Sequence, residues 1–66
     1  MYDNGQPLLQ DCHFQDHIEA EVPVQVYYQN SHKDIGFVRY YTTNFIKINN
    51  TYYNRHRFTF ISRPGY

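Results

Sequence analysis

The stretch that decides the fold is EVPVQVYYQN, residues 21–30, because the hydrophobic period of the chain changes there. Every second residue within it is apolar or aromatic, namely Val22, Val24, Val26 and Tyr28. A period of two is typical of a β-strand with one buried face. Pro23 fits this interpretation, since proline is tolerated at the beginning of a strand. We therefore expect the first strand of a β-sheet here.

N-terminal to this stretch, the sequence predicts a leader and one short helix. Residues 1–7 are polar and include a glycine and a proline, so we expect a flexible leader. Further along, three apolar residues approximate one helical face: Leu9, Phe14 and Ile18. This spacing predicts a helix over about residues 9–20. The helix must end before Pro23, because the residue before a proline is pushed to extended geometry.

C-terminal to it, short β-prone runs alternate with polar turns. The polar run 30–34 predicts a turn, and four further strands are expected over residues 36–41, 45–48, 51–53 and 57–61. Gly36 is expected to mark a bend. One helix followed by five short, bent strands predicts a mostly β fold, a small barrel of the SH3 or OB size formed by residues 8–66 as a single domain.

The last predicted strand, residues 57–61, bears on assembly. It is aromatic and β-prone, and an unpaired strand edge recruits another chain. A domain of 66 residues with a single cysteine also gains stability by oligomerising. Identical subunits that pair head to tail form a ring if the rotation closes. We therefore expect a homo-oligomer.

Charge is unevenly distributed along this neutral chain. The first 32 residues contain five carboxylates and no Lys or Arg, whereas the remainder contains six basic residues and one carboxylate, Asp34. Such asymmetry permits a basic face that meets a polyanionic partner. The single cysteine, Cys12, excludes an intrachain disulfide, and no membrane span or signal peptide is evident. We expect a cytoplasmic protein without membrane contact.

Catalytic and metal-binding patterns are weak. No nucleophile with its base, no phosphate loop and no paired carboxylates are visible, so we predict neither an enzyme nor a cofactor. His13 and His17 stand four apart on the predicted helix, beside Cys12 and Asp16, and such spacing can chelate a transition metal. Two ligands on one exposed helix are few for a site, so we interpret both histidines as polar helix surface and predict no metal.

Four motifs in order resemble the family of the bacterial Sm-like RNA chaperone Hfq. They are GQPLLQD (residues 5–11), the spacing from Asp11 to Val22-Pro23-Val24, EVPVQVYYQN followed by Gly36, and RHRFTF (residues 55–60). The resemblance runs from about Gly5 to Ile61. It implies a bent, five-stranded Sm-like barrel capped by an N-terminal helix and assembled as a ring, commonly a hexamer. It also implies binding of single-stranded RNA and a role in post-transcriptional regulation.

The resemblance also implies two groups of RNA-binding residues. In the family, the helix-bearing (proximal) face of the ring takes uridine-rich RNA, and the positions that match it here are Gln10, Thr43, Asn44, Phe45, Arg55 and His56. The opposite (distal) face takes adenine-rich RNA, and there Tyr27 and Lys33 match. The chemistry is suitable, because aromatic rings stack on bases, amides read base edges and cations meet phosphates.

Departures from the family pattern favour the helix-bearing face. Ile18, Glu19, Ala20 and Glu21 stand where many members carry an arginine patch that promotes annealing, so we expect no strong annealing. On the opposite face Asp34 repels phosphate. A second interpretation remains open: an SH3-like oligomeric module that binds protein or has a structural role, without RNA. Convergence of Gln10, Phe45, Arg55 and His56 on one concave, positive surface favours RNA, and scatter favours the module.

Overall fold

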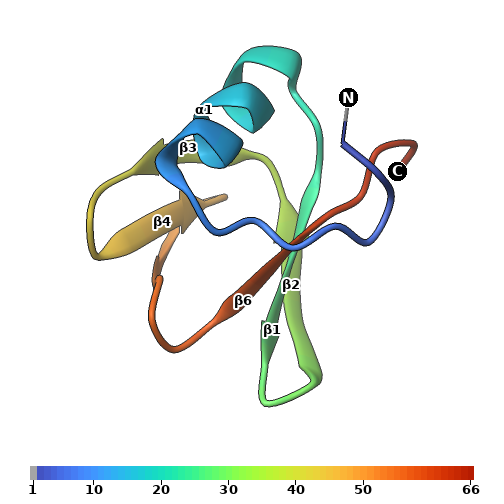
Figure 1. Ribbon diagram of the computed structural model, residues 1–66. Helices are drawn as coiled ribbons and strands as arrows, with labels where there is room; N and C mark the ends of the chain where they lie inside the picture. The colour runs from blue at the N-terminus through green and yellow to red at the C-terminus, as the bar shows by residue number, and fades with distance from the viewer. Residues whose placement is uncertain (1) are drawn as a thin grey trace.

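The computed structural model describes residues 2–66, which form one helix and six strands in two antiparallel sheets (Figure 1). The elements are α1 (Asp11–Ala20), β1 (Val24–Tyr28), β2 (Ser31–Gly36), β3 (Val38–Tyr41), β4 (Phe45–Ile48), β5 (Thr51–Asn54) and β6 (Thr59–Ser62). The strand orders are β2-β1-β6 and β3-β4-β5. The mostly β class with one N-terminal helix is confirmed, and the structure has six strands in two sheets where five strands in one bent barrel were expected.

The additional strand comes from the segment that was expected to be a turn. Gln29 and Asn30 both have positive φ, 49° and 66°, which closes a two-residue hairpin directly after β1. The chain is therefore already extended at Ser31, and of the residues expected in a turn over 30–34, those from Ser31 to Lys33 form the exposed first half of β2. Polar composition marks exposure in this segment, and the backbone of the two turn residues decides where the chain reverses.

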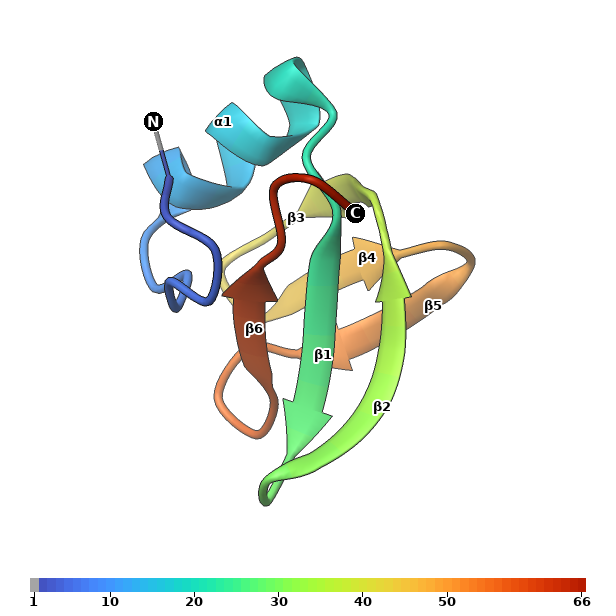
Figure 2. The same cartoon turned by 90° about the vertical axis from the view of Figure 1, so that its right-hand side faces the viewer.

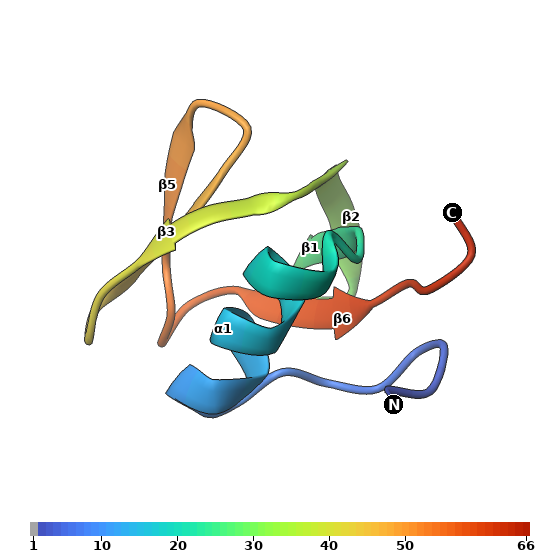
Figure 3. The same ribbon diagram turned by 90° about the horizontal axis from the view of Figure 1, so that it is seen from above.

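A sharp corner joins the two sheets. Phe37 alone separates the end of β2 from the start of β3, so the run 36–41 is split between two sheets (Figure 3). Gly36 stands at this corner, where a Cβ would overlap the side-chain amide of Asn49. The expectation that Gly36 marks a bend is confirmed, and its physical reason is the close approach of the turn between β4 and β5.

The helix begins two residues later than expected and is fixed at its start by a histidine. The ring Nδ1 of His13 accepts hydrogen bonds from the backbone N–H groups of Leu9 and Gln10, at 3.0 and 3.2 Å. Leu9 consequently stays outside the helix and is 75% exposed, so its expected place on the apolar face is wrong. The helix has ten residues. Among residues 2–66, no helix is long and apolar enough to cross a membrane.

The hydrophobic core lies between the two sheets and under α1. Figure 2 shows β6, β1 and β2 in front of β4 and β5, with the helix above them. All three layers contribute buried side chains: Leu8, Phe14, Val24, Val26, Val38, Ile46, Ile48 and Phe60. The Phe14 and Phe60 rings meet edge to face with centroids 5.5 Å apart, which packs the helix on β6.

The N-terminal segment covers part of the edge of β6. Ser62 N–H donates to the carbonyl of Gln6, and Leu8 N–H donates to the carbonyl of Phe60, both at 2.8 Å. Residues 5–8, which straddle the end of the expected leader, thus run antiparallel beside β6, with Pro7 opposite Ile61. The edge that we expected to recruit another chain is therefore partly paired within the chain, because its own N-terminal segment forms these hydrogen bonds.

His17 is buried, contrary to its expected place on the polar helix surface. Its side chain faces β6, where Ser62 is also buried. The Nδ1 atom lies 2.7 Å from the carbonyl oxygen of His13, which can only accept, so Nδ1 carries the proton. The Nε2 atom then accepts from the Ser62 hydroxyl at 2.7 Å. Both ring nitrogens are used within the fold, and burial lowers the pKa of His17 below its ordinary 6.5.

The lowered pKa of His17 makes stability dependent on pH. Below about pH 6.5 the unfolded chain binds a proton at this position more readily than the folded chain does. The contribution of neutral His17 to the free energy of unfolding is therefore fully present above that pH and is lost as the pH falls. Urea denaturation at about pH 7.5 and about pH 5.5 measures this loss of stability. We expect the free energy of unfolding to fall more between the two pH values in the natural protein than in His17→Gln.

The matched control is His32→Gln, since His32 is exposed in β2. This variant should keep the pH dependence of the natural protein. Equal pH dependence in the His17→Gln variant and the natural protein would contradict the burial argument. Direct NMR titration of the His17 ring gives a second reading that requires no variant, and a midpoint at or above 6.5 would contradict it as well.

Candidate nucleic-acid interface

The start of α1, the turn before β4 and the end of β5 meet at one end of the domain. Arg55 follows β5 directly, and its backbone N–H donates to the carbonyl of Asn44 at 2.9 Å. Its side chain reaches the residues on both sides of Gln10. The structure thus brings together the segments that carry Gln10, Asn44, Phe45 and Arg55, which are far apart in the sequence. Along the chain, Thr43 directly precedes Asn44 and His56 directly follows Arg55.

Arg55 acts here as a clamp between these segments. Its Nη1 atom lies 2.5 Å from a carboxylate oxygen of Asp11 and 2.6 Å from the carbonyl oxygen of Thr42, and Nη2 lies 3.3 Å from the carbonyl oxygen of Leu9. The Cζ atom lies 4.9 Å from the centroid of the Phe14 ring. Because the side chain is only 11% exposed, the guanidinium is directed to the fold, and Asp11 balances its charge.

The turn over residues 42–45 is fixed by Thr42. Its hydroxyl oxygen accepts the backbone N–H groups of Asn44 and Phe45, at 3.2 and 3.0 Å. The side chains of Thr43, Asn44 and Phe45 stay exposed on this turn. Sequence reasoning missed the role of Thr42, although a threonine two and three residues before the groups it binds is typical of such turns. The ring of Phe45 is 43% exposed and therefore accessible from solvent.

The neighbouring aromatic and amide residues do not cover this site. Tyr53 points away from it, because its hydroxyl donates to Asp34 at 2.6 Å on the far side of the sheet. Burial, followed by this hydrogen bond, raises the pKa of Tyr53. Asn54 lies opposite Phe45, and its side-chain oxygen accepts the backbone N–H of His56 at 2.8 Å. Both His56 and Gln10 are exposed.

The two residues predicted for the opposite face lie on the hairpin of β1 and β2. Tyr27 is half-buried, donates to Gln25 at 3.2 Å and packs edge to face on His32. Lys33 is the extra residue of a bulge between the pairs formed by Val26 and Tyr27. The carboxylate of Asp34 is held by hydrogen bonds from the Tyr53 hydroxyl and the Asn49 amide. Its side chain is thus held in place next to Lys33.

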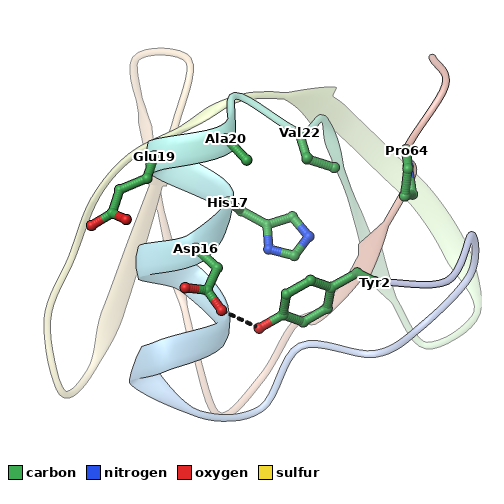
Figure 4. Close-up of a pocket in the computed structure, with 7 residues that line it drawn as sticks. All are labelled: Tyr2, Asp16, His17, Glu19, Ala20, Val22 and Pro64. Carbon is green, nitrogen blue, oxygen red and sulfur yellow. Dashed lines mark hydrogen bonds between the residues drawn. The ribbon is translucent and has the colours of Figure 1, made fainter.

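A pocket of about 540 Å³ lies on another side of α1 (Figure 4). The residues that line it are Tyr2, Asp16, His17, Glu19, Ala20, Val22 and Pro64. The Tyr2 hydroxyl donates to Asp16 at 2.9 Å, and its ring packs edge to face on His17. Burial and the Asp16 carboxylate raise the pKa of Tyr2 to about 12, so the phenol stays protonated. None of the predicted RNA-binding residues lines this pocket.

Fold and site together define a class. The chain is a small, mostly β domain in which the start of α1 and the turn before β4 carry exposed amide and aromatic side chains around Arg55, whose charge is balanced by Asp11. No family model, curated protein or solved structure matches the chain.

The clamp predicts a cost in stability at Arg55. Arg55→Ala leaves Asp11 and two carbonyl groups without their donor, so we expect the free energy of unfolding to fall by about 2 kcal/mol, as for hydrogen bonds to charged groups. The stability of Arg55→Lys should lie between that of the natural protein and that of Arg55→Ala, because an ammonium group cannot reproduce the hydrogen bonds of the planar guanidinium. Arg57→Ala is the matched control, since Arg57 is exposed, and should change stability little. Equal stability of the two alanine variants, in urea denaturation, would refute the clamp.

Proposed function

We propose that this protein is a cytoplasmic, Sm-like RNA-binding protein that resembles Hfq and acts in post-transcriptional regulation. It binds single-stranded, uridine-rich RNA at the end of the domain where α1 begins. The observation that supports this proposal is the convergence of Gln10, Asn44 and Phe45 around the Arg55 clamp. Three exposed residues suited to a base thus lie on segments that Arg55 joins at one end of the domain.

Each of these side chains has a role that suits uracil. Phe45 provides an exposed ring on a turn held by Thr42, and base stacking on such rings contributes about 1–3 kcal/mol per base. Gln10 and Asn44 carry amides that both donate and accept, so each can pair with a uracil edge that offers one N–H and two carbonyl oxygens. Single-stranded RNA leaves these edges free.

Electrostatics assigns the phosphate contacts to residues other than Arg55. The Arg55 guanidinium is paired with Asp11, so its charge contributes little to a passing phosphate. His56 and Arg57 are exposed directly after it and are free to meet phosphates. Because few cations of each subunit contact phosphates, we expect the affinity of one subunit's site for RNA to fall only modestly as the salt concentration rises.

The proposal includes a homo-oligomeric ring, with six subunits as the expected number. The corner at Phe37 joins the two sheets in the order β6-β1-β2 and β3-β4-β5, which leaves β5 and β6 at the two ends. In a head-to-tail ring, β5 of one subunit pairs with β6 of the next. Residues 5–8 cover part of β6, so assembly through this edge requires them to move or to be included in the pairing. A ring multiplies each weak contact by avidity.

Fluorescence anisotropy with oligouridine and oligoadenine, at low and physiological salt, tests the proposal. We expect tighter binding of oligouridine, and an affinity loss of about tenfold or more in Phe45→Ala because one stacking platform per subunit is removed. Gln10→Ala should reduce the preference for uridine over adenine. Tyr66→Ala is the matched aromatic control, since Tyr66 is 74% exposed and distant in sequence from the site, and it should bind as the natural protein does.

The oligomeric state is checked by sedimentation on the same samples. If the assembled protein binds neither oligonucleotide, RNA binding is refuted and the alternative remains, an SH3-like module for protein binding or structure. If Phe45→Ala retains full affinity, RNA binding stands but the site assignment fails. Tighter binding of adenine than of uridine would instead favour the hairpin residues Tyr27 and Lys33.

A further inference from the structure

The residues Gln10, Asn44 and Phe45, where α1 begins, are named the helix-end site. The outer face of the sheet β3-β4-β5 carries further aromatic and basic side chains that this site does not use. Tyr40 of β3 pairs with Lys47 of β4, and Lys47 pairs with Tyr52 of β5, so the three side chains form one row across the sheet. Phe45 lies two residues from Lys47 on the same face, and its ring meets that of Tyr52 edge to face. We name Tyr40, Lys47 and Tyr52 the strand face.

These side chains face solvent because of the packing on the other side of the sheet. Ile46 and Ile48 are buried, so the alternating residues of β4 point outward. In β3 a bulge between Val38 and Tyr40 shifts the register, which allows Val38 to be buried and Tyr40 to be exposed. As a result, Tyr40 and Tyr52 are each 55% exposed.

The charge of this region has one sign. Residues 38–54 contain Arg39 and Lys47 and no Asp or Glu. The ammonium of Lys47 lies 5.5 Å from the centroid of the Tyr52 ring, and Arg39 is exposed at the bulge. Aromatic platforms interleaved with cations are the combination that binds single-stranded nucleic acid, because the rings stack on bases and the cations meet phosphates.

A nucleic acid fits this face better than a protein does. Lysine is depleted from the cores of protein–protein interfaces, yet Lys47 lies at the centre of the row. Tyr40 and Tyr52 lie two strands apart, about 10 Å, with Lys47 between them. When bases occupy the two rings, the ammonium lies near the phosphates that link them.

We propose that the strand face binds the continuation of the RNA strand held at the helix-end site. This inference rests on the proposed function and extends it: Phe45 borders both surfaces, so one strand passes from Gln10 and Asn44 over Phe45 to Tyr52 and Tyr40. The site therefore takes a longer single strand than the helix end alone. Duplex RNA is excluded from this path, because its bases are not free to stack on the rings.

The test compares oligouridines of about four and about twelve nucleotides, lengths within the span that one domain of this size covers. In the natural protein the longer oligonucleotide should bind more tightly. In the double variant Tyr40→Ala and Tyr52→Ala the longer one should lose about tenfold or more in affinity, while the shorter one is unaffected. Tyr40→Phe with Tyr52→Phe is the matched control, since it keeps both rings and should bind both lengths normally.

Photo-crosslinking of the natural protein gives a reading that does not depend on a variant's folding. The probe is the oligouridine of about twelve nucleotides, with 5-iodouridine placed at one position at a time. Positions near one end should crosslink to Tyr40 or Tyr52, and positions near the other end should crosslink to Phe45. Crosslinks at Phe45 alone would overturn the inference.

The outcomes separate this inference from the proposed function. If Phe45→Ala weakens both lengths and the double alanine variant weakens neither, the helix-end site stands and the strand face is refuted. If the double alanine variant dissociates the oligomer, measured by sedimentation, while each length binds as before, the strand face is a contact between protein chains. If the natural protein binds neither length, both proposals fail.

Discussion

The hydrogen bonds of Arg55 are the interaction on which the arrangement of this domain depends. One guanidinium joins Asp11 and the carbonyl groups of Leu9 and Thr42 while it rests on the Phe14 ring. It thereby holds the start of α1 against the turn that leads into β4. The residues proposed to bind RNA lie on these same segments. The geometry of the candidate site therefore depends on Arg55, although the guanidinium itself is paired with Asp11 within the fold.

This use of Arg55 changes how charge is distributed over the surface of the domain. The acidic N-terminal half and the basic C-terminal half of the sequence are interleaved by folding, as the Asp11–Arg55 ion pair shows. Where α1 begins, the guanidinium of Arg55 is therefore paired with a carboxylate within the fold, so the proposed site depends on stacking and amide hydrogen bonds more than on charge. Net basic character remains on residues 38–54, where Arg39 and Lys47 have no carboxylate within their own sheet. In the proposal, the first surface combines amide contacts to base edges with stacking on Phe45, and the strand face adds two stacking rings and a cation.

Much of the fold was predictable from local patterns. The alternation beginning at Val22 located β1, the β-prone runs over 45–48 and 51–53 located β4 and β5, and the period of the preceding segment located α1 to within two residues. Local patterns failed where hydrophobicity and conformation disagree. Residues 31–34 are polar but extended, because the positive φ of Gln29 and Asn30 had already reversed the chain. Leu9 is apolar but exposed, since the helix begins after it.

The sequence by itself determined the mostly β class, the single helix and the residue types available for binding, because these depend on periodicity and composition within a few residues. Tertiary structure alone decided that His17 is buried against Ser62, that Arg55 is a clamp and that Tyr40, Lys47 and Tyr52 share a row. The reason is physical: each of these depends on contacts between segments distant in the chain, or on a bulge that changes which face a side chain occupies. No local spacing encodes such partners.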